Sequence, residues 1–186
     1  MRVIAGARRG VRLEPPGKRE KTRPTEDKLK EAVFNIIQPV KTGARVLDLF
    51  AGTGQIGIEF LSRGAEYCVF GEKSPGMVRT LRTNVEKSGF EEQAMILHAD
   101  YRQVIARSPV SFDYVYLDPP FGFRMEYESI RMLRRLERVA PGGLIIVESA
   151  REGREEPDWP EVIEGYQPVF QRAYRSQVIR IFKEEA

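Results

Sequence analysis

A glycine-rich turn at residues 52–57 constrains the fold of this chain more than any other feature of its sequence. It reads G-T-G-Q-I-G, follows the apolar run V-L-D-L-F and precedes an apolar helical pattern at residues 55–63. Glycines spaced as G-x-G-x-x-G between a buried strand and a helix are typical of a ligand-binding turn in an open parallel sheet. Taken alone, the turn indicates dinucleotide binding.

Strand-like and helix-like segments alternate through most of the chain. Strands are predicted at residues 45–50, 67–72, 94–99, 113–118 and 144–148, and helices at residues 25–38, 55–63, 75–88, 101–106 and 127–139. This alternation predicts an α/β, Rossmann-like fold with a mostly parallel sheet covered on both faces. Residues 168–174 and 177–182 instead predict an antiparallel hairpin at the sheet edge.

The composition excludes several classes of protein. One cysteine (Cys68) and one histidine (His98) exclude a disulfide framework, a four-cysteine zinc site and a histidine-based metal centre. The longest stretch without a charged residue, residues 49–58, is half the length of about 20 residues that a membrane span needs. The first ten residues also lack the apolar run of a secretory signal. We therefore expect a cytoplasmic protein that needs neither a membrane nor a metal.

Positive charge is concentrated near the N-terminus. The first 30 residues contain ten Lys or Arg and four Asp or Glu, whereas the net charge of the whole chain is only +3. Basic segments bind polyanions because their cations neutralise phosphates, although a solvated, mobile terminus is the alternative. We predict an N-terminal extension at residues 1–40, made of a hairpin and a helix, ahead of a main domain at residues 41–186. Its candidate nucleic-acid contacts are Arg8, Arg9, Arg12 and Arg23.

Acidic residues follow three consecutive predicted strands. Asp48 lies four residues before the first glycine, where a carboxylate repels a pyrophosphate but attracts the sulfonium and ammonium of S-adenosylmethionine (SAM). Glu72 is placed to accept hydrogen bonds from ribose hydroxyls, and Asp100 to meet the adenine amino group. Helix capping is the alternative role for Asp48 and Asp100. The complete predicted donor site is Asp48, Phe50, Gly52, Gly54, Glu72, Lys73, Asp100 and Tyr101.

The sequence D-P-P-F at residues 118–121 closes the fourth predicted strand. Two prolines fix the backbone and remove two N–H donors, which leaves rigid carbonyl acceptors. If the Asp118 carboxylate and the Pro119 carbonyl each accept one hydrogen of an exocyclic amine, its lone pair can turn toward a methyl donor. Phe121 would stack on the base. A rigid strand-end turn is the structural alternative.

Together these motifs resemble the class I SAM-dependent methyltransferases that modify amino groups of bases. R-V-I-A-G at residues 2–6, T-R-P-T at residues 22–25 and K-E-A-V-F-N-I-I at residues 30–37 further resemble the RsmD family. That resemblance implies a seven-stranded sheet whose last two strands are antiparallel, and a monomer that methylates guanine N2 in bacterial 16S ribosomal RNA. It also implies that the target guanine is flipped into the pocket.

Three other functions remain open at this point. The same loop chemistry would serve a DNA or RNA adenine-N6 methyltransferase. A non-catalytic RNA-binding assembly factor with a SAM fold is a second alternative. An NAD-dependent dehydrogenase is a third, although the carboxylate before the glycines opposes it.

Overall fold

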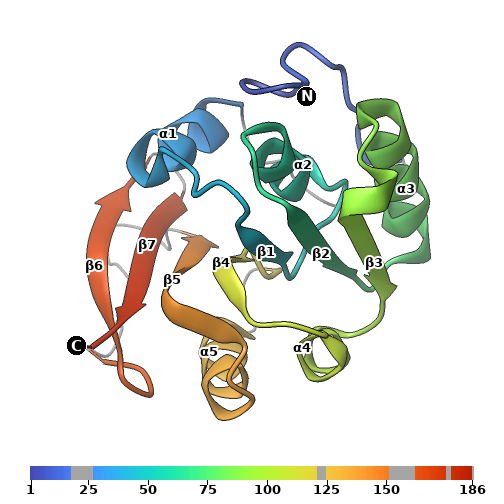
Figure 1. The fold of residues 1–186 in the computed structure, drawn as a ribbon. Helices are drawn as coiled ribbons and strands as arrows, with labels where there is room; N and C mark the ends of the chain where they lie inside the picture. Colours follow the sequence, from blue (N-terminus) through green and yellow to red (C-terminus); the bar gives the residue numbers. More distant parts are fainter. Residues whose placement is uncertain (18–26, 121–124, 151–161, 175–176, 186) are drawn as a thin grey trace.

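A computed structural model describes residues 1–17, 27–120, 125–150, 162–174 and 177–185 of the chain. Seven strands form one sheet: β1 (Arg45–Asp48), β2 (Tyr67–Glu72), β3 (Ala94–His98), β4 (Phe112–Leu117), β5 (Val139–Ala150), β6 (Tyr166–Ala173) and β7 (Gln177–Glu184). The helices are α1 (Asp27–Ile37), α2 (Gln55–Ser62), α3 (Pro75–Ser88), α4 (Tyr101–Arg107) and α5 (Met125–Arg135), with a 3-10 turn at Glu91–Gln93. Figure 1 shows α1, α2 and α3 on one face of the sheet and α4 and α5 on the other.

The sheet order is β3-β2-β1-β4-β5-β7-β6. The first five strands run parallel, and β7 lies antiparallel between β5 and β6. This confirms the predicted Rossmann-like α/β sheet and its antiparallel C-terminal pair. From β1 the chain adds β2 and β3 on one side of the sheet, and it then adds β4 and β5 on the other side of β1. Open α/β sheets bind ligands beyond the carboxyl ends of the strands at such a switch point.

The predicted strand-turn-helix unit forms as β1, the glycine turn and α2. Every residue of α2 is buried, because the helix lies between the sheet, α3 and the N-terminal segment. Gly54 caps α2 with a φ of 82°, and a Cβ there would lie 2.3 Å from Leu81 Cδ1 of α3. Any side chain at residue 54 would therefore strain the turn and displace the Leu81 side chain.

The boundary between α5 and β5 differs from the sequence prediction, which continued the helix to residue 139 and began the strand at residue 144. The helix ends at Arg135, Glu137 has a φ of 52°, and β5 begins at Val139. Val139 pairs with Phe112 of β4 before the register shifts. The prediction was wrong because a long-range strand pairing overrides the local helical pattern there.

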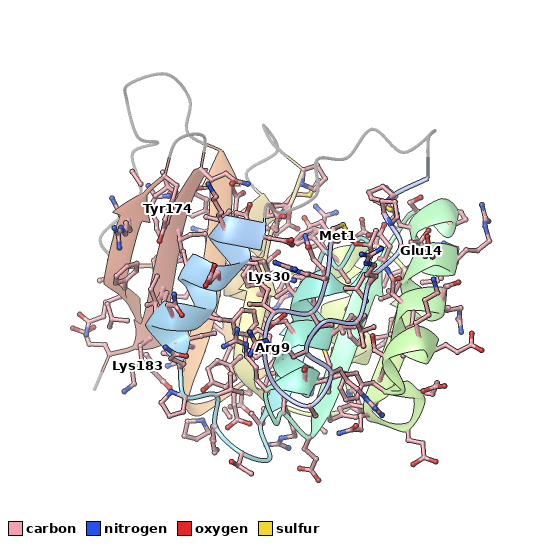
Figure 2. All side chains as sticks on the ribbon, turned by 90° about the horizontal axis from the view of Figure 1, so that it is seen from above. Met1, Arg9, Glu14, Lys30, Tyr174 and Lys183 are labelled. Carbon is pink, nitrogen blue, oxygen red and sulfur yellow. The ribbon has the colours of Figure 1, made fainter. Side chains whose placement is uncertain are left out.

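The N-terminal segment, residues 1–17, lies across α2. Figure 2 shows it between α1 and α3, with Met1 and Arg9 labelled. Its hairpin has a single bridge, from Arg2 to Arg12, and its Val3 and Leu13 side chains are buried in the main core. Gly6 approaches α2 so closely that a Cβ would lie 1.7 Å from the carbonyl oxygen of Ser62. Burial of these residues contradicts the alternative of a freely solvated terminus for this segment.

A buried ion pair joins the N-terminal segment to two helices. Glu59 of α2 accepts hydrogen bonds from the backbone N–H groups of Ile4 (2.8 Å) and Ala5 (3.0 Å). Lys30 Nζ of α1 lies 3.5 Å from Glu59 Oε2 and donates to the carbonyl of Arg2 at 2.6 Å. Both charged side chains are inaccessible to solvent. Burial lowers the pKa of Lys30, and the Glu59 charge opposes that change.

Candidate active site

One cavity of about 810 Å³ opens at the carboxyl ends of the parallel strands. It brings together nine of the residues that the sequence predicts for the donor and transfer sites: Asp48, Phe50, Gly52, Glu72, Lys73, Asp100, Tyr101, Asp118 and Pro119. Gly54 is not in the cavity wall and acts through the shape of the turn, where its N–H donates to Ala51. Phe121 lies outside the described residues.

Asp48 lies at the floor of the cavity, with 2% of its surface exposed. Its Oδ2 accepts a hydrogen bond from the N–H of Gly57 in the first turn of α2, at 2.9 Å. Burial raises the pKa of Asp48 to about 7, with the Gly57 N–H opposing and the Glu72 charge adding to the rise. Asp48 thus has the capping role considered as an alternative, while its position in the wall also gives a ligand access to it.

Glu72 holds the glycine turn from the end of β2. Its Oε2 accepts from the N–H of Gly52 at 2.9 Å, and its Oε1 from the N–H of Ser74 at 2.6 Å. Each oxygen retains a lone pair for a ligand hydroxyl, because a carboxylate has about four acceptor positions. Lys73, the next residue, also lines the cavity. Its carbonyl oxygen lies 3.1 Å from His98 Nε2 and accepts a hydrogen bond from it in the tautomer that carries a proton on Nε2.

Asp100 and Tyr101 form the far wall. Asp100 caps α4 by accepting from the N–H of Arg102 at 3.1 Å, as its alternative role predicts. The Tyr101 ring lies 5.6 Å from the ring of Phe50, and the two rings give the cavity an aromatic surface. The Tyr101 hydroxyl donates to Glu128 Oε2 at 2.6 Å, and burial raises the pKa of Tyr101 to about 12.

Asp118 and Pro119 follow β4, the neighbour of β1 in the sheet, and line the cavity wall near Asp48. Asp118 is partly buried and Pro119 is buried, whereas Pro120 is exposed. Burial raises the pKa of Asp118 well above its ordinary value, and the charges of Glu148, Asp48 and Glu126 raise it further. A nearby cation would strongly stabilise the ionised form of an acid in this environment.

A second buried carboxylate lies behind this wall and was missed by the sequence analysis. Glu148 of β5 is fully buried; its Oε2 accepts from the Tyr116 hydroxyl at 2.6 Å and its Oε1 from the Gln177 amide. Tyr116 and Gln177 line the cavity themselves. The sequence held a signal for Glu148, because it ends the predicted strand at residues 144–148 just as Glu72 and Asp118 end theirs. The role of Gln177 had no local signal, since β7 is distant in sequence.

The predicted nucleic-acid residues lie on the N-terminal segment. Arg8, Arg9 and Arg12 are exposed, and Arg8 also stacks on the ring of Phe90, 5.8 Å from its centre. Arg23 lies outside the described residues.

The described ranges lack two features. Within those ranges, no helix combines the length and the apolar character needed to cross a bilayer. The same residues contain no group of three or more potential metal ligands.

The sheet order and the glycine turn together define a Rossmann-like methyltransferase fold. Residues 1–183 match the family described as "Conserved hypothetical protein 95". The chain is 35% identical over 156 residues to "Ribosomal RNA small subunit methyltransferase D" of Haemophilus influenzae, covering 82% of this chain and 80% of the relative. The protein of the same name in Escherichia coli K12 is 33% identical over 154 residues, which cover 82% of this chain and 76% of that relative.

A solved structure gives the same result. "Putative methyltransferase yhhF from Escherichia coli" superposes with a TM-score of 0.85 at 29% identity, covering all of this chain and 98% of the other. The chain belongs to the RsmD family.

Proposed function

We propose that this protein transfers a methyl group from SAM to the exocyclic N2 of a guanine in 16S ribosomal RNA. The observation that carries the proposal is the meeting of two predicted half-sites in one cavity. The glycine turn with Asp48 and Glu72 forms one wall, and Asp118 with Pro119 forms the other. The rRNA substrate is supported by the names of relatives that share a third of their residues with this chain.

The chemistry of the first wall suits SAM. When bound, SAM supplies a methyl group on a positively charged sulfur. Asp48, Glu72 and Asp100 offer carboxylate oxygens to its cationic and hydroxyl groups, and a phosphate ligand would meet repulsion from the same three acids. The rings of Phe50 and Tyr101 offer an apolar surface for its adenine.

The wall formed by Asp118 and Pro119 suits a flat amino group. The Asp118 carboxylate and the Pro119 carbonyl would each accept one N–H, which turns the nitrogen lone pair toward the methyl carbon. Transfer places positive charge on that nitrogen, and the acidic surroundings of Asp118 stabilise the charge.

The N-terminal segment is the proposed RNA-docking surface. Its exposed arginines are held in place by a backbone bound to α2, so they present cations without the entropy cost of ordering a loose arm. Replacing Arg9 and Arg12 by Gln should weaken RNA binding and reduce the slope of log K against log salt by about 1.4–1.8. Arg107→Gln with Arg135→Gln, on the α4 and α5 face, is the matched control. An equal loss of slope in both double variants would place the RNA elsewhere.

The decisive experiment measures transfer of labelled methyl from SAM to small-subunit particles, free 16S rRNA and duplex DNA. We expect N2-methylguanosine in the rRNA product by mass spectrometry, at a single mapped nucleotide. N6-methyladenosine in DNA or RNA would instead support the adenine alternative.

Binding data separate the remaining alternatives. Calorimetry should detect SAM binding and no NAD binding. RNA binding without any methyl transfer would favour a non-catalytic assembly factor.

A further inference from the structure

Glu148 of β5 acts electrostatically on Asp118, which follows directly after the neighbouring parallel strand β4. Leu117, the last residue of β4, pairs with Val147 of β5, so the next residue along each chain is Asp118 and Glu148. Neighbouring strands are about 4.8 Å apart, and residues in register point to the same face. Tyr116, two residues before Asp118, shares that face and donates its hydroxyl to Glu148. The buried Glu148 and Tyr116 and the partly buried Asp118 thus form one cluster at the cavity wall.

Among the residues that the structure describes, the groups that act on this cluster are acidic or neutral. The charged groups that act on Asp118 are Glu148, Asp48 from β1 and Glu126 from α5. Glu148 faces neutral hydrogen-bond donors, Tyr116 from β4 and Gln177 from β7. Arg180 of β7 faces the other side of the sheet, where it donates to Ser149 and Gln171. Two adjacent buried carboxylates cannot both ionise without a large free-energy cost.

We propose that Glu148 is a positioning residue that shares one proton with Asp118 in the empty site, and that binding of the cationic methyl donor releases this proton. The inference rests on the proposed function, because it takes a sulfonium donor as the ligand. Burial raises the pKa of Glu148 to about 7 and that of Asp118 well above its ordinary value, so both carboxyl groups hold protons more tightly than in water.

The proton balance closes over one turnover. Donor binding leaves Asp118 and Glu148 both ionised and sends one proton to solvent. The guanine N2 then bonds to the methyl carbon, the carbon–sulfur bond breaks, and its electron pair stays on sulfur. The amino nitrogen gives one proton to Asp118, so the pair again holds one proton when the positive charge on sulfur has gone. Glu148 favours this step because its charge makes Asp118 a stronger base.

The test is to count protons released on ligand binding to the full chain, by calorimetry at pH 7 in phosphate and in Tris. SAM and S-adenosylhomocysteine carry the same adenosine and amino acid groups, so their difference isolates the sulfonium charge. We expect SAM to release up to about one proton more than S-adenosylhomocysteine. Its dissociation constant should fall by up to about tenfold from pH 6 to pH 7, and that of S-adenosylhomocysteine much less.

Two variants locate the proton. Glu148→Gln keeps the size of the side chain and an oxygen for Tyr116, and it should lower the extra release by at least half and flatten the pH dependence. Asp118→Asn should do the same by removing the other partner. The matched control is Glu128→Gln, which alters the second tyrosine–glutamate pair of the cavity and should leave the proton count unchanged.

The outcomes distinguish the two proposals. Equal proton release with SAM and S-adenosylhomocysteine in the wild-type protein overturns the shared proton, whether or not the variants fold. Full release retained in a folded Glu148→Gln variant removes Glu148 from the mechanism. If SAM fails to bind at all, the proposed function itself is wrong.

Discussion

Two groups of acids line the same cavity, and they differ in what their oxygens contact. On the donor wall, Glu72 and Asp100 accept hydrogen bonds from backbone N–H groups. Beside them, the exposed Glu128 carboxylate accepts from Tyr101 and forms an ion pair with Arg102. On the wall formed by Asp118 and Pro119, here called the transfer wall, the charges of described residues that act on Asp118 come from other carboxylates.

The difference separates two uses of the same residue type. Acids that are satisfied by N–H groups fix the shape of the donor wall before any ligand arrives. Acids that repel one another store unfavourable charge, which only a cation relieves. The comparison predicts that changes on the transfer wall affect mainly the reaction rate and the pH dependence of binding and stability, whereas changes on the donor wall affect mainly the affinity for SAM.

The largest expected effect comes from Asp118→Ala. It removes an acceptor that stabilises charge in the transition state, so kcat should fall by at least about 100-fold. The dissociation constant of SAM should change far less, which equilibrium binding measures. A variant that loses SAM affinity and rate in equal proportion would erase the distinction between the two walls.

Glu72→Ala should have a smaller effect, on binding. The change leaves the N–H groups of Gly52 and Ser74 without their acceptor, which loosens the glycine turn. We expect SAM to bind about tenfold more weakly and kcat at saturation to stay near the wild-type value. Glu86→Ala, an exposed acid on α3, serves as the control. A loss of kcat at saturating SAM would place Glu72 in the transfer step instead.

The smallest effect concerns stability and pH. Burial raises the pKa of Asp48 and Glu148 to about 7 in the folded protein, so the folded state binds more protons than the unfolded chain between about pH 4 and 7. The free energy of unfolding of the empty protein therefore falls as pH rises toward 7 and then levels off. The melting temperature should be higher at pH 6 than at pH 8, by a few degrees.

Variants separate the contribution of Glu148 to this pH dependence from that of Asp48. Glu148→Gln should reduce the difference in melting temperature between pH 6 and pH 8. Glu128→Gln should leave it unchanged, because hydrogen bonds from Arg102 and Tyr101 lower the pKa of Glu128, away from this range. Equal effects of the two variants would contradict the assignment.

The fold was largely predictable because local patterns specify most of its elements. The glycine turn is one example, because the residues that specify it lie between residues 45 and 63. The end of α5 was missed because the pairing of Val139 with Phe112 joins segments that are distant in sequence. Likewise, basic composition does not reveal that residues 1–17 are anchored by Glu59.

The candidate site was predictable where an acid follows a strand. Asp48, Glu72, Asp100 and Asp118 all reach the cavity. Their hydrogen-bond partners were not predictable, since these depend on how the turn and α2 return to the strand ends. The pairing of Glu148 with Tyr116 and Gln177 requires the register of β4, β5 and β7, which only the structure supplies.

Helix α2 links the ligand cavity to the N-terminal segment over a short distance. Its eight residues span about 12 Å; its first turn is bonded to Asp48, while Glu59 and Ser62 hold the backbone of residues 4–8. Substituting the exposed side chains of this segment leaves these backbone hydrogen bonds in place. A deletion or insertion in its main chain would instead disturb the same short helix that shapes the glycine turn.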